Sequence, residues 1–344
     1  MITDNTLFNT IITTLPSFEQ VEDFDRESIF TELLDFSKTE STQEDLFKMY
    51  FEYNKYKKIL HFLRVGDMIL AEYNLKYIAD KKIEYSNSRS ATCMESLYSP
   101  VVAYYYYKKK DYENADSNLR TAYAKFDVLY QQGYKNVVFN FVEQKINEFR
   151  IFIHTGEIDN ALGTIETLVT NIISPDGFYH FDCNFSAVCL SEAELVSYLN
   201  YLFDICSAYL LINKHHLRTN EELAIRFIDE MLRVLAVPVK DEVNTQLLMT
   251  FKGLKMIYSG AEMDFFTMIA NLPAELLNQN TCSSFAYIFY KTILERLHSN
   301  NSALYDEAIL LFKSNKKSKA YSLFLQRLLQ DEKLRQVTVT ANSL

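Results

Sequence analysis

The sequence predicts an all-α protein, an α-α superhelix built from antiparallel helix hairpins. Turn residues are scarce, since the 344 residues include only 7 glycines and 5 prolines, whereas sheet proteins need both for their many tight turns. A helix–turn–helix pattern also appears three times, and a short motif recurs with a period near 45 residues. Such an array can exceed the usual size of one compact domain, because each unit buries its apolar face on its neighbours.

Residues 1–43 are expected to form a helical N-terminal segment that leads into the repeats. Apolar residues follow helical spacing at Ile29, Phe30, Leu33 and Leu34. A polar link then precedes Ser41 and Glu44, which are spaced as a capping box. The sequence therefore predicts that a long helix starts there.

Residues 44–173 are expected to form three helix pairs with a shared turn motif. An acidic residue follows each turn, an alanine lies four residues later, and an aromatic residue lies nine residues before that alanine. The acidic residue suits the positive end of a helix dipole, and the alanine allows the two helices to approach closely. The turns are Arg64-Val65-Gly66-Asp67, Lys109-Lys110-Asp111-Tyr112 and Thr155-Gly156-Glu157-Ile158; the alanines are Ala71, Ala115 and Ala161; the aromatic residues are Phe62, Tyr106 and Phe152.

This motif resembles the tetratricopeptide repeat family. The matching segments are Lys110-Asp111-Tyr112-Glu113-Asn114-Ala115, Tyr305-Asp306-Glu307-Ala308 with Phe312, and, more weakly, Thr219 to Ala224 and Ser259-Gly260-Ala261-Glu262. The resemblance implies a solenoid with an extended inner groove. It departs from the family in its period, which is longer than the usual unit of about 34 residues, and in its lack of tryptophan. A generic array of helical hairpins remains the alternative.

Residues 174–192 interrupt the pattern and are expected to form an irregular insertion loop. Ser174-Pro175-Asp176-Gly177 is a turn signal, an aromatic stretch without helical period follows it, and Ser191 with Glu194 is spaced to cap a new helix. Residues 193–335 are expected to form a second, more degenerate helical half. Residues 336–344 are expected to be a disordered tail.

The composition disfavours some classes of binding partner and some cellular locations. The formal net charge of −10 disfavours nucleic acid as a partner, because phosphate contacts need a basic surface. The lysine runs at 108–110 and around 316–319 fall at expected helix ends, where cations complement the helix dipole. No secretory signal or membrane span is evident, and five irregularly spaced cysteines suit reduced thiols. A cytoplasmic protein without membrane contact is expected.

The motifs of common enzymes are missing from the sequence. It has no glycine-rich phosphate loop, no His-Glu-x-x-His and no Gly-x-Ser-x-Gly, so no catalytic residue, cofactor or metal is predicted. His180, Asp182, Cys183 and Cys189 could ligate zinc, but their spacing fits no closed site and favours a packed loop. His215 and His216 are adjacent, so on a helix they would point about 100° apart.

The predicted function is a scaffold or adaptor that binds a protein or peptide segment in a concave groove. Tyrosine and arginine are favoured at binding hot spots, and the basic groups would favour an acidic peptide or a free carboxylate. Three alternatives stay open: a peptide-responsive sensor whose superhelix compacts, an enzyme with a site near residues 180–189, and an assembly protein that forms homo-oligomers. The aromatic residues could also serve only for packing. The candidate groove residues are Tyr53, Tyr56, Arg64, Tyr104, Tyr107, Lys108, Arg150 and His154.

Overall fold

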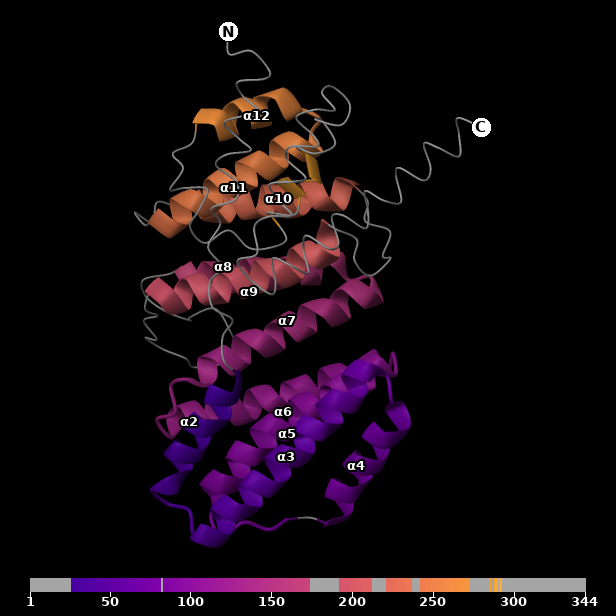
Figure 1. Ribbon diagram of the computed structural model, residues 1–344, viewed down its shortest axis with the longest axis vertical. Coiled ribbons are helices and arrows are strands. Elements are labelled where there is room, and N and C mark those ends of the chain that lie inside the picture. Colours follow the sequence, from indigo (N-terminus) through magenta and orange to yellow (C-terminus); the bar gives the residue numbers. More distant parts are fainter. Residues whose placement is uncertain are drawn as a thin grey trace, which may run out of the picture. The chain divides into compact units, whose positions relative to one another are not determined.

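The computed structural model describes residues 26–81, 83–173, 192–211, 221–236 and 242–271, together with Phe285, Ile288, Phe289, Lys291 and Thr292. These residues form helices and turns without a strand, which confirms the all-α prediction for the described part of the chain (Figure 1). None of the described helices is long and apolar enough to span a bilayer. The chain divides into two compact units, and the division falls between Ser191 and Glu192.

Several sequence-based predictions lie outside the described residues. They concern the insertion loop before Glu192, the C-terminal tail, the lysine run around Lys316, and the repeat-like segment from Tyr305 to Phe312. The zinc candidates and the histidine pair also lie there, at His180, Asp182, Cys183, Cys189, His215 and His216.

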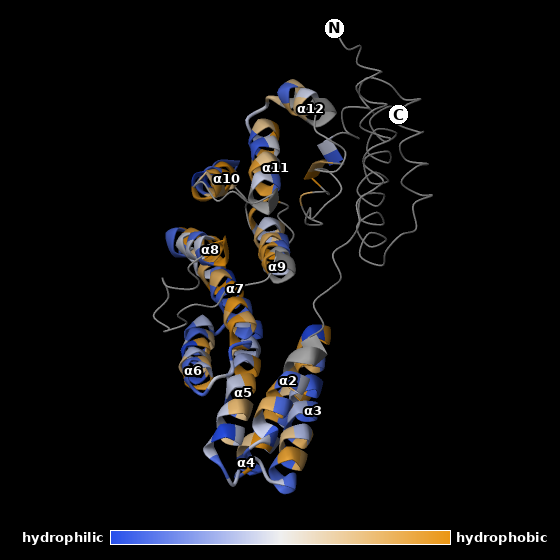
Figure 2. Cartoon of the chain, turned by 90° about the vertical axis from the view of Figure 1, so that its left-hand side faces the viewer, coloured by the Kyte–Doolittle hydropathy of each residue, from blue (hydrophilic) through white to orange (hydrophobic). Residues whose placement is uncertain are grey.

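The first unit contains three antiparallel helix pairs preceded by one further helix. α3 pairs with α4, α5 with α6, and α7 with α8, while α5 also packs on α3 and α7 packs on α6. In Figure 2, α5 and α7 follow one another in one column, with α6 and α8 beside them. The helices are α2 (Arg26–Lys38), α3 (Gln43–Val65), α4 (Met68–Lys81), α5 (Ser88–Lys108), α6 (Tyr112–Gln131), α7 (Val137–Thr155) and α8 (Ile158–Ile173).

The three hairpin turns share one hydrogen-bond pattern. The amide of the acidic residue donates to the carbonyl of the aromatic residue five positions earlier, from Asp67 to Phe62 at 2.9 Å, from Asp111 to Tyr106 at 3.0 Å and from Glu157 to Phe152 at 2.8 Å. This bond closes the end of the first helix in the way that a left-handed residue allows. The predicted alanines, Ala71, Ala115 and Ala161, are fully buried, as their role in close helix approach requires.

The residue before the acidic residue adopts the left-handed conformation in each turn. It is glycine in two turns, with φ of 85° at Gly66 and 83° at Gly156. In the turn between α5 and α6 it is Lys110, with φ of 61°. Left-handed φ costs an L-residue about 1–2 kcal/mol, a penalty that glycine escapes. Lys110 is therefore held in a conformation that its side chain disfavours.

The second unit repeats the turn pattern, but here the large residue is on the second helix of the hairpin and the small residue is on the first. Its helices are α9 (Glu192–Leu210), α10 (Glu221–Leu235), α11 (Glu242–Tyr258) and α12 (Glu262–Asn271). The Ala261 amide donates to the Met256 carbonyl at 2.8 Å, and Phe265 stands where the other hairpins have alanine. On the preceding helix Gly253 makes room, since a Cβ atom there would come 2.9 Å from Met268 Cε of α12 and 3.3 Å from the Phe289 ring.

The start of α3 differs from the sequence-based prediction by one residue. The cap is Thr42, whose hydroxyl accepts the Asp45 amide at 3.1 Å, rather than Ser41. The Ser41 hydroxyl instead forms a 2.6 Å hydrogen bond with the hydroxyl of Ser90 on α5. A contact between distant parts of the chain thus decides between two residues that could both cap the helix.

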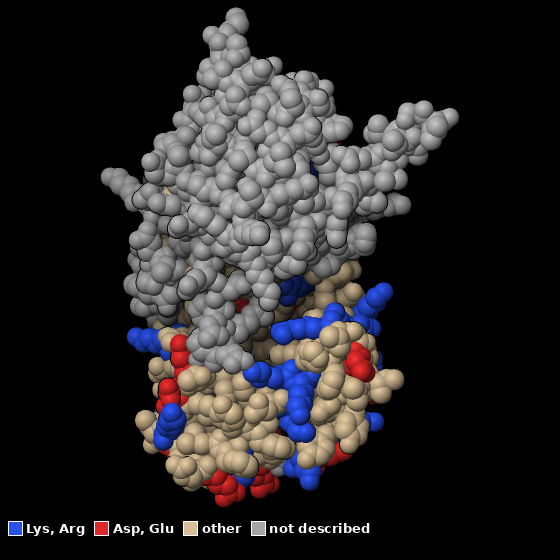
Figure 3. All heavy atoms as spheres, viewed as in Figure 1, with Lys and Arg blue, Asp and Glu red and all other residues tan. Residues whose placement is uncertain are grey.

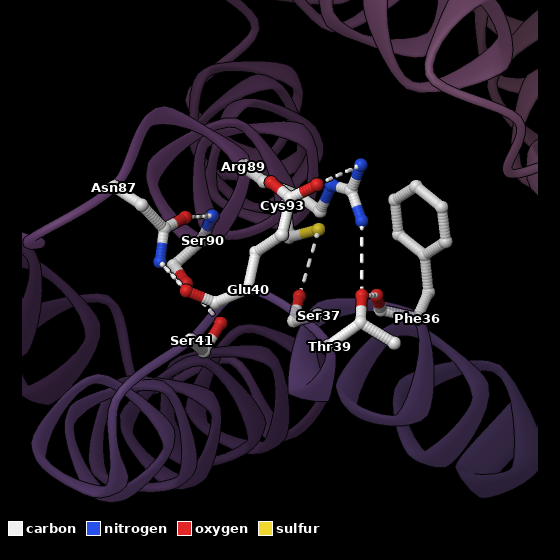
Figure 4. Close-up of polar contacts among 9 residues, drawn as sticks. All are labelled: Phe36, Ser37, Thr39, Glu40, Ser41, Asn87, Arg89, Ser90 and Cys93. Carbon is white, nitrogen blue, oxygen red and sulfur yellow. Dashed lines mark hydrogen bonds and ion pairs between the residues drawn. The ribbon is translucent and has the colours of Figure 1, made fainter.

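The end of α2 and the link to α3 are fastened to the start of α5 (Figure 4). Arg89 forms a 2.6 Å ion pair with Glu40 and places its guanidinium 4.6 Å from the centre of the Phe36 ring. The Ser37 hydroxyl donates to the Cys93 sulfur at 3.3 Å, and burial raises the pKa of that thiol to about 11. α2 is therefore an integral part of the first unit.

Two buried carboxylates of α3 hold the link between α4 and α5. Asp45 accepts the Ser86 amide at 2.9 Å, and Glu52 accepts the Tyr85 hydroxyl at 2.6 Å. Burial alone would raise the pKa of Asp45, but hydrogen bonding, mainly from Ser86, outweighs it and holds the pKa below the ordinary value. At Glu52 burial prevails and raises the pKa, although hydrogen bonds from Tyr85 and Tyr56 oppose it.

Candidate functional site

The C-terminal ends of α5 and α7 bring four of the predicted groove residues together. The Tyr107 ring lies 5.4 Å from the His154 ring, and it stacks on Tyr104 at 6.2 Å with the planes 16° apart. The Lys108 ammonium lies 5.4 Å from the centre of the Tyr104 ring. These contacts join residues that are 47 positions apart in the sequence, from Tyr107 to His154.

A residue that the sequence analysis missed completes this group. Tyr112, the first residue of α6, stacks on His154 with ring centres 5.8 Å apart and planes within 6°, and it meets Tyr107 edge-on at 6.0 Å. We call Tyr107, Tyr112 and His154 the aromatic cluster. All three rings are half-buried, and both tyrosines pack against a core formed by Ala103, Ala115, Leu119 and Ile151.

The electrostatics of the aromatic cluster favour a neutral histidine beside exposed cations. Burial lowers the pKa of His154 from its ordinary value, and the charge of nearby Lys110 lowers it further. At neutral pH the imidazole is therefore uncharged. The ammonium groups of Lys108 and Lys110 are on exposed residues. The site thus offers half-buried aromatic faces and two accessible positive charges, which suits a ligand that combines an apolar part with an anionic group.

Polar side chains continue the site along α7. Asn147 donates from Nδ2 to Gln144 Oε1 at 2.8 Å, and Arg150 donates from its guanidinium to Asn147 Oδ1. Gln144, Asn147, Arg150 and His154 follow at intervals of three, three and four residues, so they share one face of the helix. Hydrogen bonding orients the amide and guanidinium groups beside the aromatic cluster.

The predicted groove residues of the first hairpin lie elsewhere. Tyr53 stacks on Phe30 of α2 with ring centres 3.6 Å apart, so α2 covers that side of α3. Tyr56 is only 4% exposed, and its hydroxyl donates to Glu52 at 3.3 Å. The structure therefore places Tyr56 inside the unit, where it cannot line an open groove. Arg64 is exposed near the end of α3.

One signal in the sequence could have pointed to Lys110. When the four turns are aligned on their acidic or equivalent residue, glycine stands at 66, 156 and 260, and lysine stands at 110. A lysine at a position that demands positive φ is a local inconsistency, and such outliers concentrate at functional sites.

Metal binding finds no support among the described residues, where no group of three His, Cys, Asp or Glu side chains is placed to hold an ion. Comparison with known proteins adds no assignment, since no family model, curated protein or solved structure matches the chain.

Proposed function

We propose that this protein is a helical-repeat scaffold that binds a protein or peptide segment along α5 and α7, with an anionic group of that segment at Lys108 and Lys110. In this proposal the helix pairs form a superhelix of the kind that the tetratricopeptide resemblance implies, and the α5–α7 surface faces its inner side. The bound segment places an apolar or aromatic side chain on the aromatic cluster.

The left-handed conformation of Lys110 is the observation that carries this proposal. A glycine at position 110 would satisfy the turn at lower energy, as it does at 66 and 156. Non-glycine residues in this strained conformation are concentrated at functional sites. Lys110 is exposed and immediately precedes the turn residue before Tyr112 of the aromatic cluster, its charge helps to lower the pKa of His154, and a cation beside half-buried rings is suited to an anionic partner.

The polar face of α7 supports a peptide as the ligand. Extended peptides need partners for their amide groups at regular intervals, and orientable amide and guanidinium side chains supply them. Asn147 and Arg150, both half-buried, offer such groups next to the aromatic cluster, and the buried Gln144 amide orients Asn147. Small metabolites would need a more enclosed cavity.

The experiment is a selection from a display library of natural protein segments on the full-length chain, followed by binding titrations of the selected peptides. Lys110→Gly and Arg150→Ala should each weaken binding by about tenfold or more, which corresponds to about 1.4 kcal/mol. Lys135→Ala, at an exposed lysine in the turn before α7, serves as the matched control. Unchanged affinity in both site variants would overturn the proposal.

A further inference from the structure

Exposed apolar side chains gather on the first hairpin. Of nine large apolar residues that are exposed in the described part of the chain, seven lie on α3, α4 or the turn between them. Phe47 is 74% exposed, Ile69 82% and Tyr73 66%. Side chains of this size are seldom grouped in contact with water unless they meet a partner.

These residues form one surface across both helices. On α3, Phe47 and Phe51 are four residues apart; on α4, Leu70, Tyr73 and Tyr77 follow at intervals of three and four. Lys55 joins the two helices, because its ammonium lies 5.5 Å from the centre of the Phe51 ring and 4.7 Å from that of Tyr77. We call Phe47, Phe51, Lys55, Leu70, Tyr73 and Tyr77 the α3–α4 outer face.

The same part of α3 is strongly basic in an acidic chain. Between positions 46 and 65 it carries five cations, and its one acidic residue, Glu52, is buried and bound to Tyr85. Within the described residues, neither Lys55 nor Lys58 has a carboxylate partner. In Figure 3, Lys and Arg side chains gather over the middle and upper right of the first unit, and Asp and Glu side chains appear at its lower edge, at its left edge and at one place on the right.

We propose that the α3–α4 outer face docks an amphipathic helix of another protein that carries acidic residues beside its apolar stripe. The intervals of three and four residues on both helices match the ridges that a third helix would pack against. Carboxylates of that helix would pair with Lys55 and Lys58, whose charges would otherwise be desolvated without compensation.

The position of Lys55 distinguishes this occupant from a membrane or a second copy of the chain. Lys55 is at the centre of the apolar surface, held between two aromatic rings, so burial in lipid would place an unpaired charge in hydrocarbon. Symmetric pairing of two copies through this face would set its cations against the same cations of the other copy. An acidic helix meets neither obstacle.

The test uses the full-length protein and a synthetic amphipathic helical peptide with Leu and Phe on one face and Glu along its edges. Binding is followed by fluorescence anisotropy, and the same peptide with Lys in place of Glu is the charge control. We expect the Glu peptide to bind and the Lys peptide to bind at least about tenfold more weakly. Lys55→Glu and Tyr73→Ala should each weaken binding of the Glu peptide to a similar degree.

Two matched variants control for the site. Val128→Ala alters an exposed apolar residue on α6, and Lys135→Ala alters an exposed lysine in the turn before α7; both should leave binding of the Glu peptide unchanged. All variants are checked by circular dichroism and thermal melting. Equal binding of both peptides, or no binding of the Glu peptide, would overturn the inference. Two further outcomes, each without peptide binding and each lost in Tyr73→Ala, would also overturn the inference. Sedimentation with phosphatidylserine vesicles would indicate a membrane as the partner, and concentration-dependent dimerisation would indicate a second copy of the chain.

Discussion

Ala115 of α6 packs with Ala103 of α5 in one buried cluster, so this hairpin closes through two methyl side chains. The two residues are twelve positions apart, and the same interval links Ile59 to Ala71, Phe149 to Ala161 and Gly253 to Phe265, all of them in helical hairpins. At least one member of each pair is alanine or glycine. We infer that the combined size of the two side chains in each pair sets the distance between the paired helices.

Enlarging Ala115 should open the second hairpin. We expect Ala115→Leu to destabilise the protein by about 1–3 kcal/mol, because a well-packed interface cannot accept three further carbon atoms without displacing its neighbours. Ala124→Leu, on the exposed side of the same helix, should change the free energy of unfolding by less than about 0.5 kcal/mol. Urea denaturation measures both, and equal effects would show that Ala115 does not set the helix distance.

Exchanging residues at the left-handed turn position should have opposite effects in two hairpins. Lys110→Gly should stabilise the protein by up to about 1 kcal/mol, since glycine adopts positive φ without a steric penalty. Gly66→Lys, at the equivalent position of the first hairpin, should destabilise it by about 1–2 kcal/mol. Thermal melting of the two variants tests this. A loss of stability in Lys110→Gly would mean that the lysine side chain supports the fold.

The titration of His154 should appear in the pH dependence of stability. Its pKa in the folded protein lies below the ordinary value of 6.5, so the unfolded chain binds a proton that the folded protein resists. The resulting stability is complete above pH 6.5 and falls as the pH drops below it. His154→Gln should therefore lose less stability than the natural protein between pH 7 and pH 5. An equal decrease in melting temperature between pH 7 and pH 5 for the two proteins would contradict this.

The titration of Glu52 should affect the pH dependence of stability in the opposite direction to that of His154. The pKa of Glu52 is raised above the ordinary value of 4.5, so the folded protein binds a proton more tightly than the unfolded chain does. The stability gained from this proton is present below pH 4.5 and is lost as the pH rises through the folded pKa. Glu52→Gln, which keeps an acceptor for Tyr85, should be at least as stable as the natural protein at pH 7.

An alanine at position 52 provides the control for that variant. Glu52→Ala removes the acceptor for the Tyr85 and Tyr56 hydroxyls and should destabilise the protein by about 1–3 kcal/mol. If the Gln and Ala variants are equally destabilised at pH 7, the charge of Glu52 is favourable in the folded state.

Cys93 should resist alkylation in the folded protein. Its thiol is buried, accepts a hydrogen bond from Ser37 and has a pKa raised to about 11, whereas the thiolate is the reactive form. Labelling with iodoacetamide at pH 8, followed by mass spectrometry, should modify Cys93 only slowly until denaturant is added. Rapid labelling of native protein would show that the contact between α2 and α5 opens readily.

Turn chemistry made much of the first unit predictable from its sequence. The acidic residue, the alanine and the aromatic residue act within a span of nine positions, and all three hairpins follow that local pattern. The start of α3 was not predictable to the residue. Ser41 and Thr42 both suit a helix cap, and only the distant contact with Ser90 separates them.

The repeat period, which equates positions about 45 residues apart, accounts for part of the residue grouping found in the structure. This period aligns Tyr107 on α5 with His154 on α7, and the structure brings their rings together. Tyr112 lies on the second helix of its hairpin, so that alignment passed over it. The contacts of Tyr53 and Tyr56 could not be predicted: Tyr53 stacks on Phe30 of α2 and Tyr56 donates to Glu52, and neither contact follows from local spacing.

The attachment of α2 has a practical consequence for how the protein is prepared. A shortened chain that started at Gln43 would strip Phe30 from Tyr53, leave Cys93 without the Ser37 hydroxyl and remove the carboxylate that neutralises Arg89. Expression trials that trim the N-terminus to obtain crystals should therefore keep everything from Arg26 onward. Trimming further would be expected to yield aggregated material, even though every helix hairpin would remain in the chain.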